Sequence, residues 1–337
     1  MDFYSDNAAG VHPAVLAAVT GAAGPHAKGY DADDWTARLD AAFGALFETP
    51  CRVFAVPSGT AANALGLAAM LPPWGALWCE REAHVEVDEA GAVPFYSGGA
   101  THLLVAGAHG KLSVEALSEA AGRRRGDVHQ TQAAALSLTQ ATEAGTVYAP
   151  DEIAALSAWA RARGCRVHMD GARFANAVAH LGCAPADVTW RAGVEILSFG
   201  CIKNGGMSAE ALVVFAPDLA ASIPHRRKRA GLMPSKGRFA AAQLLAMIDG
   251  GVWLANARAA NAGAAAIAAA VPQRLLHPVQ ANEVFLRLDA DERQALRRQG
   301  FGFYEWESDG PGAARLVVRW DADSHAIAAL VAALRAL

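Results

Sequence analysis

Short apolar stretches alternate with longer amphipathic ones from about residue 50 to residue 216. Runs rich in aliphatic residues, each too short for a helix, predict buried strands at 51–56, 134–139, 165–170, 194–200 and 210–216. Helical spacing predicts helices at 58–71, 149–164 and 172–182. Helices that alternate with short apolar strands are typical of a mostly parallel sheet covered on both faces, so the pattern predicts an α/β fold.

The pattern changes after about residue 245. A long alanine-rich helix at roughly 251–271 leads to three alternating strand candidates with helices between and after them, at 282–288, 301–306 and 314–320. We therefore predict a large domain at 26–248 and a smaller α+β domain at 249–337. Residues 1–25 precede the first strand of the sheet, and we expect this N-terminal segment to pack with the small domain.

Composition narrows the classes of function. At 337 residues the chain can bury a sizeable core, and its net charge of −4 gives no indication of a nucleic-acid surface. No stretch of about 18 apolar residues lacks a charge, so no membrane span is predicted. The N-terminus lacks the basic-then-apolar order of a secretion signal, and the five cysteines are scattered without a CxxC pair. We expect a cytoplasmic protein with no metal site and no disulfide framework.

The first stretch with candidate chemistry follows the strand at 51–56, where Ser58, Gly59 and Thr60 open a helix. Free backbone N–H groups and the positive end of the helix dipole suit an anion, and two hydroxyls add further donors. The stretch therefore indicates a phosphate site, although a serine N-cap explains it as well when it is taken alone. It is not GxGxxG and no GK[ST] follows, which disfavours a nucleotide.

Asp170 is the last residue of the predicted interior strand at 165–170, and Lys203 lies just beyond the one at 194–200. Open α/β sheets bind ligands at this edge. A carboxylate there needs a partner, for example a protonated ring nitrogen, but an N-cap for the helix at 172–182 explains Asp170 equally well. Lys203 is one of only five lysines in the chain, and it lies three residues beyond the end of the apolar run VEILSFG. Desolvation favours an uncharged amine that can attack a carbonyl, whereas a lysine extending to solvent is the simpler interpretation.

Together the three features meet the needs of pyridoxal 5'-phosphate (PLP). That cofactor requires a lysine for its Schiff base, a carboxylate beside its pyridine nitrogen and an anchor for its phosphate. The whole chain then resembles the L-threonine aldolases, which are fold-type-I PLP-dependent enzymes of the β-eliminating-lyase group. The blocks that carry the resemblance are YSDNAAG, FAVPSGTAANALGLA, EREAHVEVDEAGAVPFYSGG, SLTQATEAGTVYAPDEI, HMDGARFANAVAHLG, SFGCIKNG and ARLVVRWD.

The resemblance implies an aspartate-aminotransferase-like large domain with a mostly parallel seven-stranded sheet. It also implies retro-aldol cleavage of L-threonine or L-allo-threonine to glycine and an aldehyde. For the cofactor it places Lys203 in the covalent bond to PLP and Asp170 at the pyridine nitrogen. It assigns the binding of the PLP phosphate to Ser58, Gly59 and Thr60. His84 stacks on the ring near the substrate hydroxyl, and His129 lies near the substrate side chain.

The resemblance also implies how the amino-acid substrate is bound. Arg173 and Arg315 match two arginines that hold the α-carboxylate, with Ser5 nearby, and Arg173 also lies at the cofactor. Arg319 is an alternative to Arg315 as a ligand of the α-carboxylate, since it lies four residues further on and could face the same side of the strand. Tyr30 matches a tyrosine that reaches the site of a neighbouring subunit. The family therefore implies a homodimer or homotetramer with shared active sites.

Three departures from the family pattern concern the phosphate contacts, the Tyr30 loop and the preferred substrate. Ile202 precedes Lys203, where the family often has Ser or Thr, and Cys201 occupies a position where Gly is common. Tyr30 is followed by Asp31 and Ala32, where the family has Gly-Asp.

Other functions stay open at this point. The nearest is an aldolase for phenylserine or another bulky or α-substituted β-hydroxy amino acid. PLP-dependent β-elimination or racemisation, and a non-catalytic PLP-binding scaffold, are further alternatives. A nicotinamide-dependent enzyme is disfavoured because no glycine-rich turn is followed by an acidic residue about 20 positions later. Which histidine acts as the base is also open.

Overall fold

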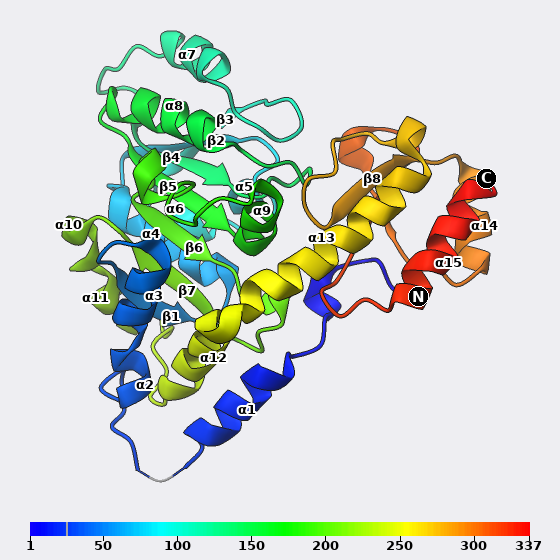
Figure 1. The fold of residues 1–337 in the computed structure, drawn as a ribbon. Helices are drawn as coiled ribbons and strands as arrows, with labels where there is room; N and C mark the ends of the chain where they lie inside the picture. The colour runs from blue at the N-terminus through cyan, green and yellow to red at the C-terminus, as the bar shows by residue number, and fades with distance from the viewer. Residues whose placement is uncertain (25) are drawn as a thin grey trace.

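A seven-stranded sheet forms the larger part of the computed structural model, which describes residues 1–24 and 26–337 (Figure 1). Its strands are β1 (Arg52–Val56), β2 (Gly75–Glu80), β3 (Thr101–Val105), β4 (Gln132–Thr139), β5 (Arg166–Gly171), β6 (Ile196–Phe199) and β7 (Glu210–Val214). They lie in the order β1-β7-β6-β5-β4-β2-β3, and among them β7 runs antiparallel to both of its neighbours. The sheet is mostly parallel with seven strands, as predicted. β2 and β3 are the strands that the apolar pattern did not single out.

Helices cover both faces of this sheet. The helices of this part of the chain are α1 (Pro13–Ala22), α2 (Asp34–Ala37), α3 (Leu39–Phe47), α4 (Gly59–Met70), α5 (His84–Val87), α6 (Ala92–Ser97), α7 (Val114–Gly122), α8 (Pro150–Arg161), α9 (Phe174–Leu181), α10 (Pro217–Ala220), α11 (Ile223–Arg229) and α12 (Arg238–Ile248). Successive side chains of a strand point to opposite faces. Val53 and Ala55 of β1 accordingly pack in the core with α3, α8, α9 and α12, whereas Phe54 and Val56 pack with α4 and α11.

The C-terminal part of the chain forms a second, smaller sheet. Helix α13 (Val252–Ala270) leads to antiparallel strands in the order β8-β10-β9, followed by α15 (Ser324–Arg335) (Figure 1). The strands are β8 (Glu283–Arg287), β9 (Tyr304–Glu305) and β10 (Ala313–Val317), with α14 (Ala290–Arg298) between β8 and β9. The strand predicted at 301–306 is reduced to the two residues of β9, because Gly302 pairs with Asp2 instead.

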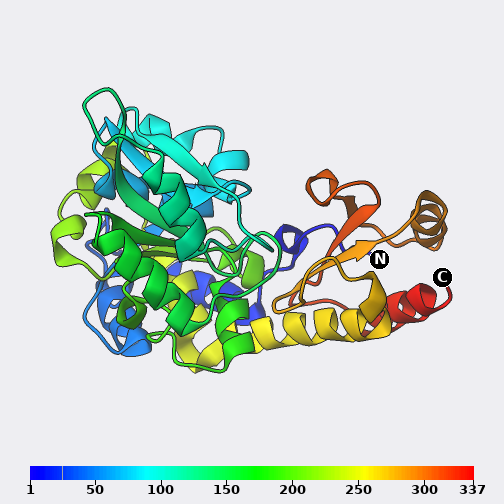
Figure 2. The same cartoon turned by 90° about the horizontal axis from the view of Figure 1, so that it is seen from above.

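The N-terminal segment contacts both parts of the molecule. The Phe3 backbone exchanges hydrogen bonds with Gly302 and Val317 at 2.9 Å each, and its ring is buried in the C-terminal core. Helix α1, in contrast, packs against α12 beside the large sheet. Figure 2 shows the N-terminus beside the small sheet, with α13 extending from the large sheet to the C-terminal elements. The domain boundaries at 25 and 248 stay a prediction.

One helical stretch, Arg238–Ala270, is long and apolar enough to cross a membrane by length and composition alone. In this structure it consists of two helices, because Gly250 adopts a φ of +67° between α12 and α13. Helix α13 packs against α9, α15 and β8, which is the arrangement of a core helix.

Candidate active site

Asp170 lies buried at the carboxyl end of β5, where it pairs with Thr139 on β4 and Ser198 on β6. Its Oδ1 accepts a hydrogen bond from the backbone N–H of Ala172 at 3.0 Å, and its Oδ2 accepts one from Nδ2 of Asn63 at 2.8 Å. Asn63 sits one turn into α4 and holds the carboxylate from the neighbouring helix. The alternative prediction of Asp170 as an N-cap is wrong, because the helix after β5 begins at Phe174 with Arg173 as its N-cap. Each oxygen of Asp170 keeps a free lone pair for a further partner.

His84 begins α5 and is joined to Asp170 through a short chain of polar groups. Its Nδ1 lies 2.8 Å from Oε1 of Glu89, and the same oxygen accepts a hydrogen bond from Asn63. The hydrogen bond to Glu89 is the main cause that raises the pKa of His84 above its ordinary value, against the opposing effect of burial. Ligand atoms of His84, Glu89 and Asp170 lie within 4.8 Å of one another, a spacing that a metal ion also requires. The hydrogen bonds through Asn63 already account for this cluster without one.

Lys203 lies in a single 3₁₀ turn, Ile202–Asn204, directly after β6. The buried carboxylate of Glu210, at the start of β7, accepts hydrogen bonds from the backbone N–H groups of Cys201 and Ile202 and so holds this turn. Burial raises the pKa of Glu210 to about 7. Gly200 is required before the turn, because a Cβ there would stand 2.3 Å from the carbonyl oxygen of Ala172.

The predicted phosphate stretch lies at the N-terminus of α4, after β1. Ser58 is the N-cap, and its Oγ accepts a hydrogen bond from the backbone N–H of Ala61 at 3.2 Å. Gly59 faces open space, since a Cβ built there meets no atom within 4 Å. Ser58, Gly59 and Thr60 are all partly exposed, so their free backbone N–H groups are accessible to an anion.

Arg173 and Arg315 meet at one buried carboxylate, that of Glu283 on β8. Arg315 donates to Oε1 of Glu283 from Nε at 3.2 Å and from Nη2 at 2.6 Å, and Nη1 of Arg173 lies 3.4 Å from Oε2. Arg173 also donates from Nε and Nη2 to the two oxygens of Asp6, at 2.8 and 3.0 Å. Burial acts to raise the pKa of Asp6, but the charges of Arg173 and Lys203 outweigh it and lower that pKa to about 2.

Three other predicted residues do not join this cluster within the chain. Ser5 is close in sequence to Asp6, but its Oγ accepts a hydrogen bond from Asn7 as the N-cap of the turn at 6–8. Tyr30 is exposed, and Nζ of Lys228 lies 4.2 Å from the centre of its ring. Arg319 binds Asp2 and Asp321, whereas Arg315 binds Glu283, so the structure separates these two competitors.

His129 lies at the other edge of the sheet. It is exposed in the loop before β4, whose first residue, Gln132, pairs with Gly75 at the start of β2. Asp170 pairs with Thr139 at the opposite end of β4. Within one chain, the structure therefore brings His84 to the candidate site and leaves His129 at the far end of the strand.

These residues fit PLP. Among the residues that the structure describes, Lys203 Nζ has no hydrogen-bond or ion-pair partner, and its charge acts on Asp6, Glu143 and Glu210. A carboxylate, Asp170, is presented on the neighbouring strand. The start of α4 offers open space beside Gly59 for an anion. A free amine, an acceptor for a ring N–H and an anion-binding helix end are the three groups that this cofactor uses.

The structure adds residues that the sequence analysis missed, namely Asp6, Asn63, Glu89, Glu143, Glu210 and Glu283. All except Glu143 are nearly inaccessible to solvent. A polar residue inside an apolar run is the signal that was available for two of them, in NALGLA at Asn63 and in NEVFL at Glu283. Most of the partners of these residues lie far away along the chain, for example Asp170 for Asn63 and Arg173 for Asp6, so these contacts could not be predicted from local patterns.

The fold and these residues define a fold-type-I PLP-dependent enzyme. A solved structure of the enzyme SPT with PLP has the same fold. It superimposes with a TM-score of 0.72 at 15% sequence identity, and the match covers 100% of this chain and 86% of the SPT chain. The chain belongs to the β-eliminating lyase family, which matches residues 2–291.

Two further matches are to threonine aldolases. The low specificity L-threonine aldolase of Pseudomonas aeruginosa is 43% identical over 99% of this chain and 96% of its own length. The structure of a threonine aldolase from Leishmania major superimposes with a TM-score of 0.92 at 25% identity, over 99% of this chain and 98% of that one. The resemblance inferred from the sequence blocks is thus confirmed at the level of the family and the fold.

Proposed function

We propose that this protein is a PLP-dependent aldehyde-lyase that cleaves L-threonine and related L-β-hydroxy-α-amino acids to glycine and an aldehyde. The observation that carries the proposal is the convergence of Lys203, Asp170 and Arg173 at one edge of the sheet, in a chain of the β-eliminating lyase family. When bound, PLP supplies an electron-accepting ring for the pair released from the Cα–Cβ bond. Lys203 would hold it covalently, Asp170 would keep its pyridine nitrogen protonated, and the N-terminus of α4 would bind its phosphate.

His84 is the residue we assign as the base for the β-hydroxyl. Glu89 accepts the hydrogen on Nδ1, so Nε2 is the nitrogen that is free to take up the hydroxyl proton. Breaking of the Cα–Cβ bond then releases the aldehyde, and a proton delivered to Cα completes glycine. Arg315 and the remaining N–H groups of Arg173 would orient the α-carboxylate.

A spectroscopic experiment tests this function. The purified protein should absorb visible light after addition of PLP, and borohydride should then attach PLP to the peptide that contains Lys203. L-Threonine should yield glycine and acetaldehyde, and Lys203→Ala should abolish this activity. A colourless protein that does not bind PLP, or an active Lys203→Ala variant, would contradict the proposal. A 2-oxo acid and ammonia in place of glycine would indicate β-elimination instead.

We further propose that the enzyme works in the cytoplasm as a homodimer or homotetramer. The exposed ring of Tyr30 and the exposed His129 support the oligomeric state, because both are accessible to a second subunit. Light scattering on the purified protein tests the oligomeric state. A monomer with full activity would contradict the shared site.

A further inference from the structure

The turn after β4 carries a carboxyl group that the proposed mechanism does not use, that of Glu143. The backbone N–H of Gln140, where this turn begins, donates to the carbonyl oxygen of Asp170 at 2.8 Å. Further along the turn, a Cβ built on Gly145 would stand 3.0 Å from the Cβ of Glu283. The turn therefore lies between the strand that carries the candidate cofactor carboxylate and the strand that carries the carboxylate between the two arginines.

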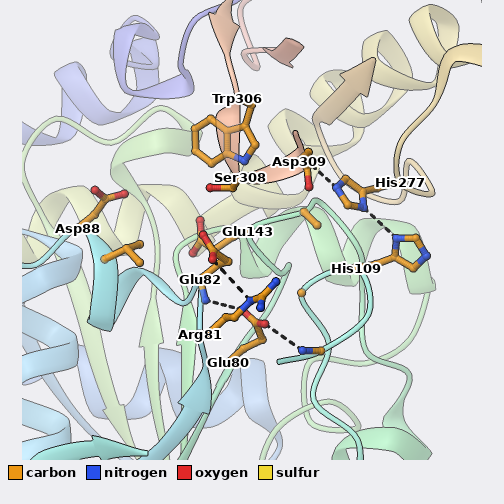
Figure 3. Close-up of a pocket in the computed structure, with 14 residues that line it drawn as sticks. Glu80, Arg81, Glu82, Asp88, His109, Glu143, His277, Trp306, Ser308 and Asp309 are labelled. Atoms are coloured by element: carbon orange, nitrogen blue, oxygen red, sulfur yellow. Dashed lines mark hydrogen bonds and ion pairs between the residues drawn. The ribbon is translucent and has the colours of Figure 1, made fainter. Parts of the chain in front are cut away.

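Glu143 lines a cavity of about 370 Å³ between the carboxyl edge of the large sheet and the C-terminal elements (Figure 3). The residue is half-buried, and Figure 3 shows it below Trp306 in this view. Val87 lines the same cavity and ends the short helix that His84 begins. Glu143 and His84 therefore reach the candidate site from two different elements, the turn after β4 and α5.

Charged groups of the candidate site surround Glu143 without binding it. Burial is the main cause that raises the pKa of Glu143 above its ordinary value, and the charge of Glu283 adds to this effect. The positive charges of Arg173 and Lys203 act in the opposite direction. Among the residues that the structure describes, no group forms a hydrogen bond or an ion pair with Glu143. A carboxylate with a raised pKa is a stronger base than an exposed one, and an unpaired carboxylate is free to accept a proton.

We propose that Glu143 is a second catalytic base, which accepts the β-hydroxyl proton of one Cβ epimer of threonine, while His84 accepts that of the other. With the α-carboxylate at the arginines and the methyl group in one place, inversion at Cβ turns the hydroxyl to a second direction. A base on a second element then serves that epimer. This inference rests on the function proposed above, because it divides the same reaction between two residues.

The proton and electron balance of this step is closed. The hydroxyl proton moves to a carboxylate oxygen of Glu143, and the electron pair of the O–H bond forms the C=O bond of the aldehyde. The Cα–Cβ bond breaks, and its electron pair stays with the glycine part until Cα takes up a proton. One proton is lost from oxygen and one is gained by carbon, so the step needs no oxidant, reductant or further reactant.

The values of kcat/KM for L-threonine and L-allo-threonine, measured separately on the PLP-saturated enzyme, test this division. Glu143→Gln keeps the shape of the side chain but cannot take up the proton, so it should lower kcat/KM for one epimer about a hundredfold more than for the other. His84→Asn should shift the ratio of the two values in the opposite direction. Glu143→Asp, which keeps a carboxylate, should restore part of the ratio. The ratio is the informative quantity, because any change in cofactor binding affects both epimers.

A measurement on the PLP-free protein checks the basicity of Glu143 independently of activity. The folded state holds the Glu143 proton at a pH at which the unfolded state releases it, because burial raises the pKa above the ordinary 4.5. This stabilisation is fully present below about pH 4.5 and is lost as the pH rises through the folded value. In urea unfolding, the stability of the wild type relative to Glu143→Gln should therefore fall as the pH rises. An equal pH dependence of the two proteins overturns the assignment of Glu143 as a base.

Glu82→Gln is the matched control. Glu82 lines the same cavity, and its Oε1 lies 3.7 Å from Nε of Arg81. Loss of its charge should leave the epimer ratio unchanged, and a shift as large as that of Glu143→Gln would reveal a general effect of cavity charge and overturn the proposal. An unchanged ratio in Glu143→Gln, or a wild-type enzyme that cleaves only one epimer, overturns it as well. Absence of glycine from both epimers in the wild type would instead refute the proposed function.

Discussion

Nδ1 of His84 lies 2.8 Å from Oε1 of Glu89, and Asn63 donates to that same oxygen and to Asp170. We assign the hydrogen of the neutral ring to Nδ1, where it can be donated to this oxygen, which leaves Nε2 as the basic nitrogen. One buried network thus fixes both the tautomer of the candidate base and the orientation of the candidate cofactor carboxylate.

Glu89→Gln should move the acid limb of the pH profile of kcat/KM to lower pH. The bond to Glu89 raises the pKa of His84, and a base is active only when it is neutral. Without that bond His84 loses its proton at lower pH, so activity persists further into acid. The plateau should fall about tenfold, because a less basic and less oriented imidazole is a poorer base. Glu86→Gln, which affects the contact to His102, is the control and should leave the limb unchanged.

Gly59→Ala should weaken PLP binding without destabilising the protein. A Cβ at Gly59 meets no protein atom within 4 Å, so it occupies only the space next to the free N–H groups of α4. We expect an affinity for PLP about tenfold lower, measured by titration, and an unchanged melting temperature of the PLP-free protein. Normal PLP affinity in this variant would show that the phosphate lies elsewhere.

Gly200→Ala, in contrast, should destabilise the folded protein. Its Cβ would stand 2.3 Å from the carbonyl oxygen of Ala172, so the backbone before Lys203 must shift. Overpacking of this kind costs about 1–3 kcal/mol in the free energy of unfolding. Urea unfolding of the PLP-free protein checks this, and wild-type stability would contradict the close approach seen here.

Glu283→Gln should lower KM for the amino acid while reducing stability without substrate. The glutamine oxygen still accepts from Arg315, but the negative charge between the two arginines is lost. A buried charge left without its partner destabilises a protein, and it also attracts the carboxylate of a ligand. We expect a KM several-fold lower, a lower melting temperature and a larger stabilisation by glycine than in the wild type. A higher KM would show that the charge of Glu283 is needed to position the arginines.

Because of Glu210, the free energy of unfolding should fall as the pH rises to about 7. Burial raises the pKa of Glu210 from 4.5 to about 7, so the folded state holds a proton that the unfolded state releases. The contribution is fully present below about pH 4.5 and is lost as the pH passes the folded value. Its size is roughly 3 kcal/mol in the free energy of unfolding. Glu210→Gln should remove this slope between about pH 4.5 and 7 in urea titrations, and parallel curves for the two proteins would contradict it.

Much of the fold could be predicted because its signals are local. The apolar run at 165–170 overlaps all of β5 except Gly171, the run at 194–200 contains β6, and Ser58 is the N-cap of the predicted helix. Strand and helix periodicity is set by neighbouring residues, so it survives in the sequence. The same local pattern predicted Asp170 at the carboxyl end of one strand and Lys203 just beyond another, at the edge where the candidate site lies.

The remaining features depend on residues that are distant along the chain. The predicted strand at 301–306 is short because Gly302 pairs with the N-terminal segment, and His129 lies at the far edge because of the direction of β4. Arg173 binds Asp6 across 167 positions. The sequence alone therefore determined which side chains stand at the ends of the strands. Only the tertiary structure decided which carboxylate each arginine and histidine meets, since buried charges are stable only with partners that folding brings together.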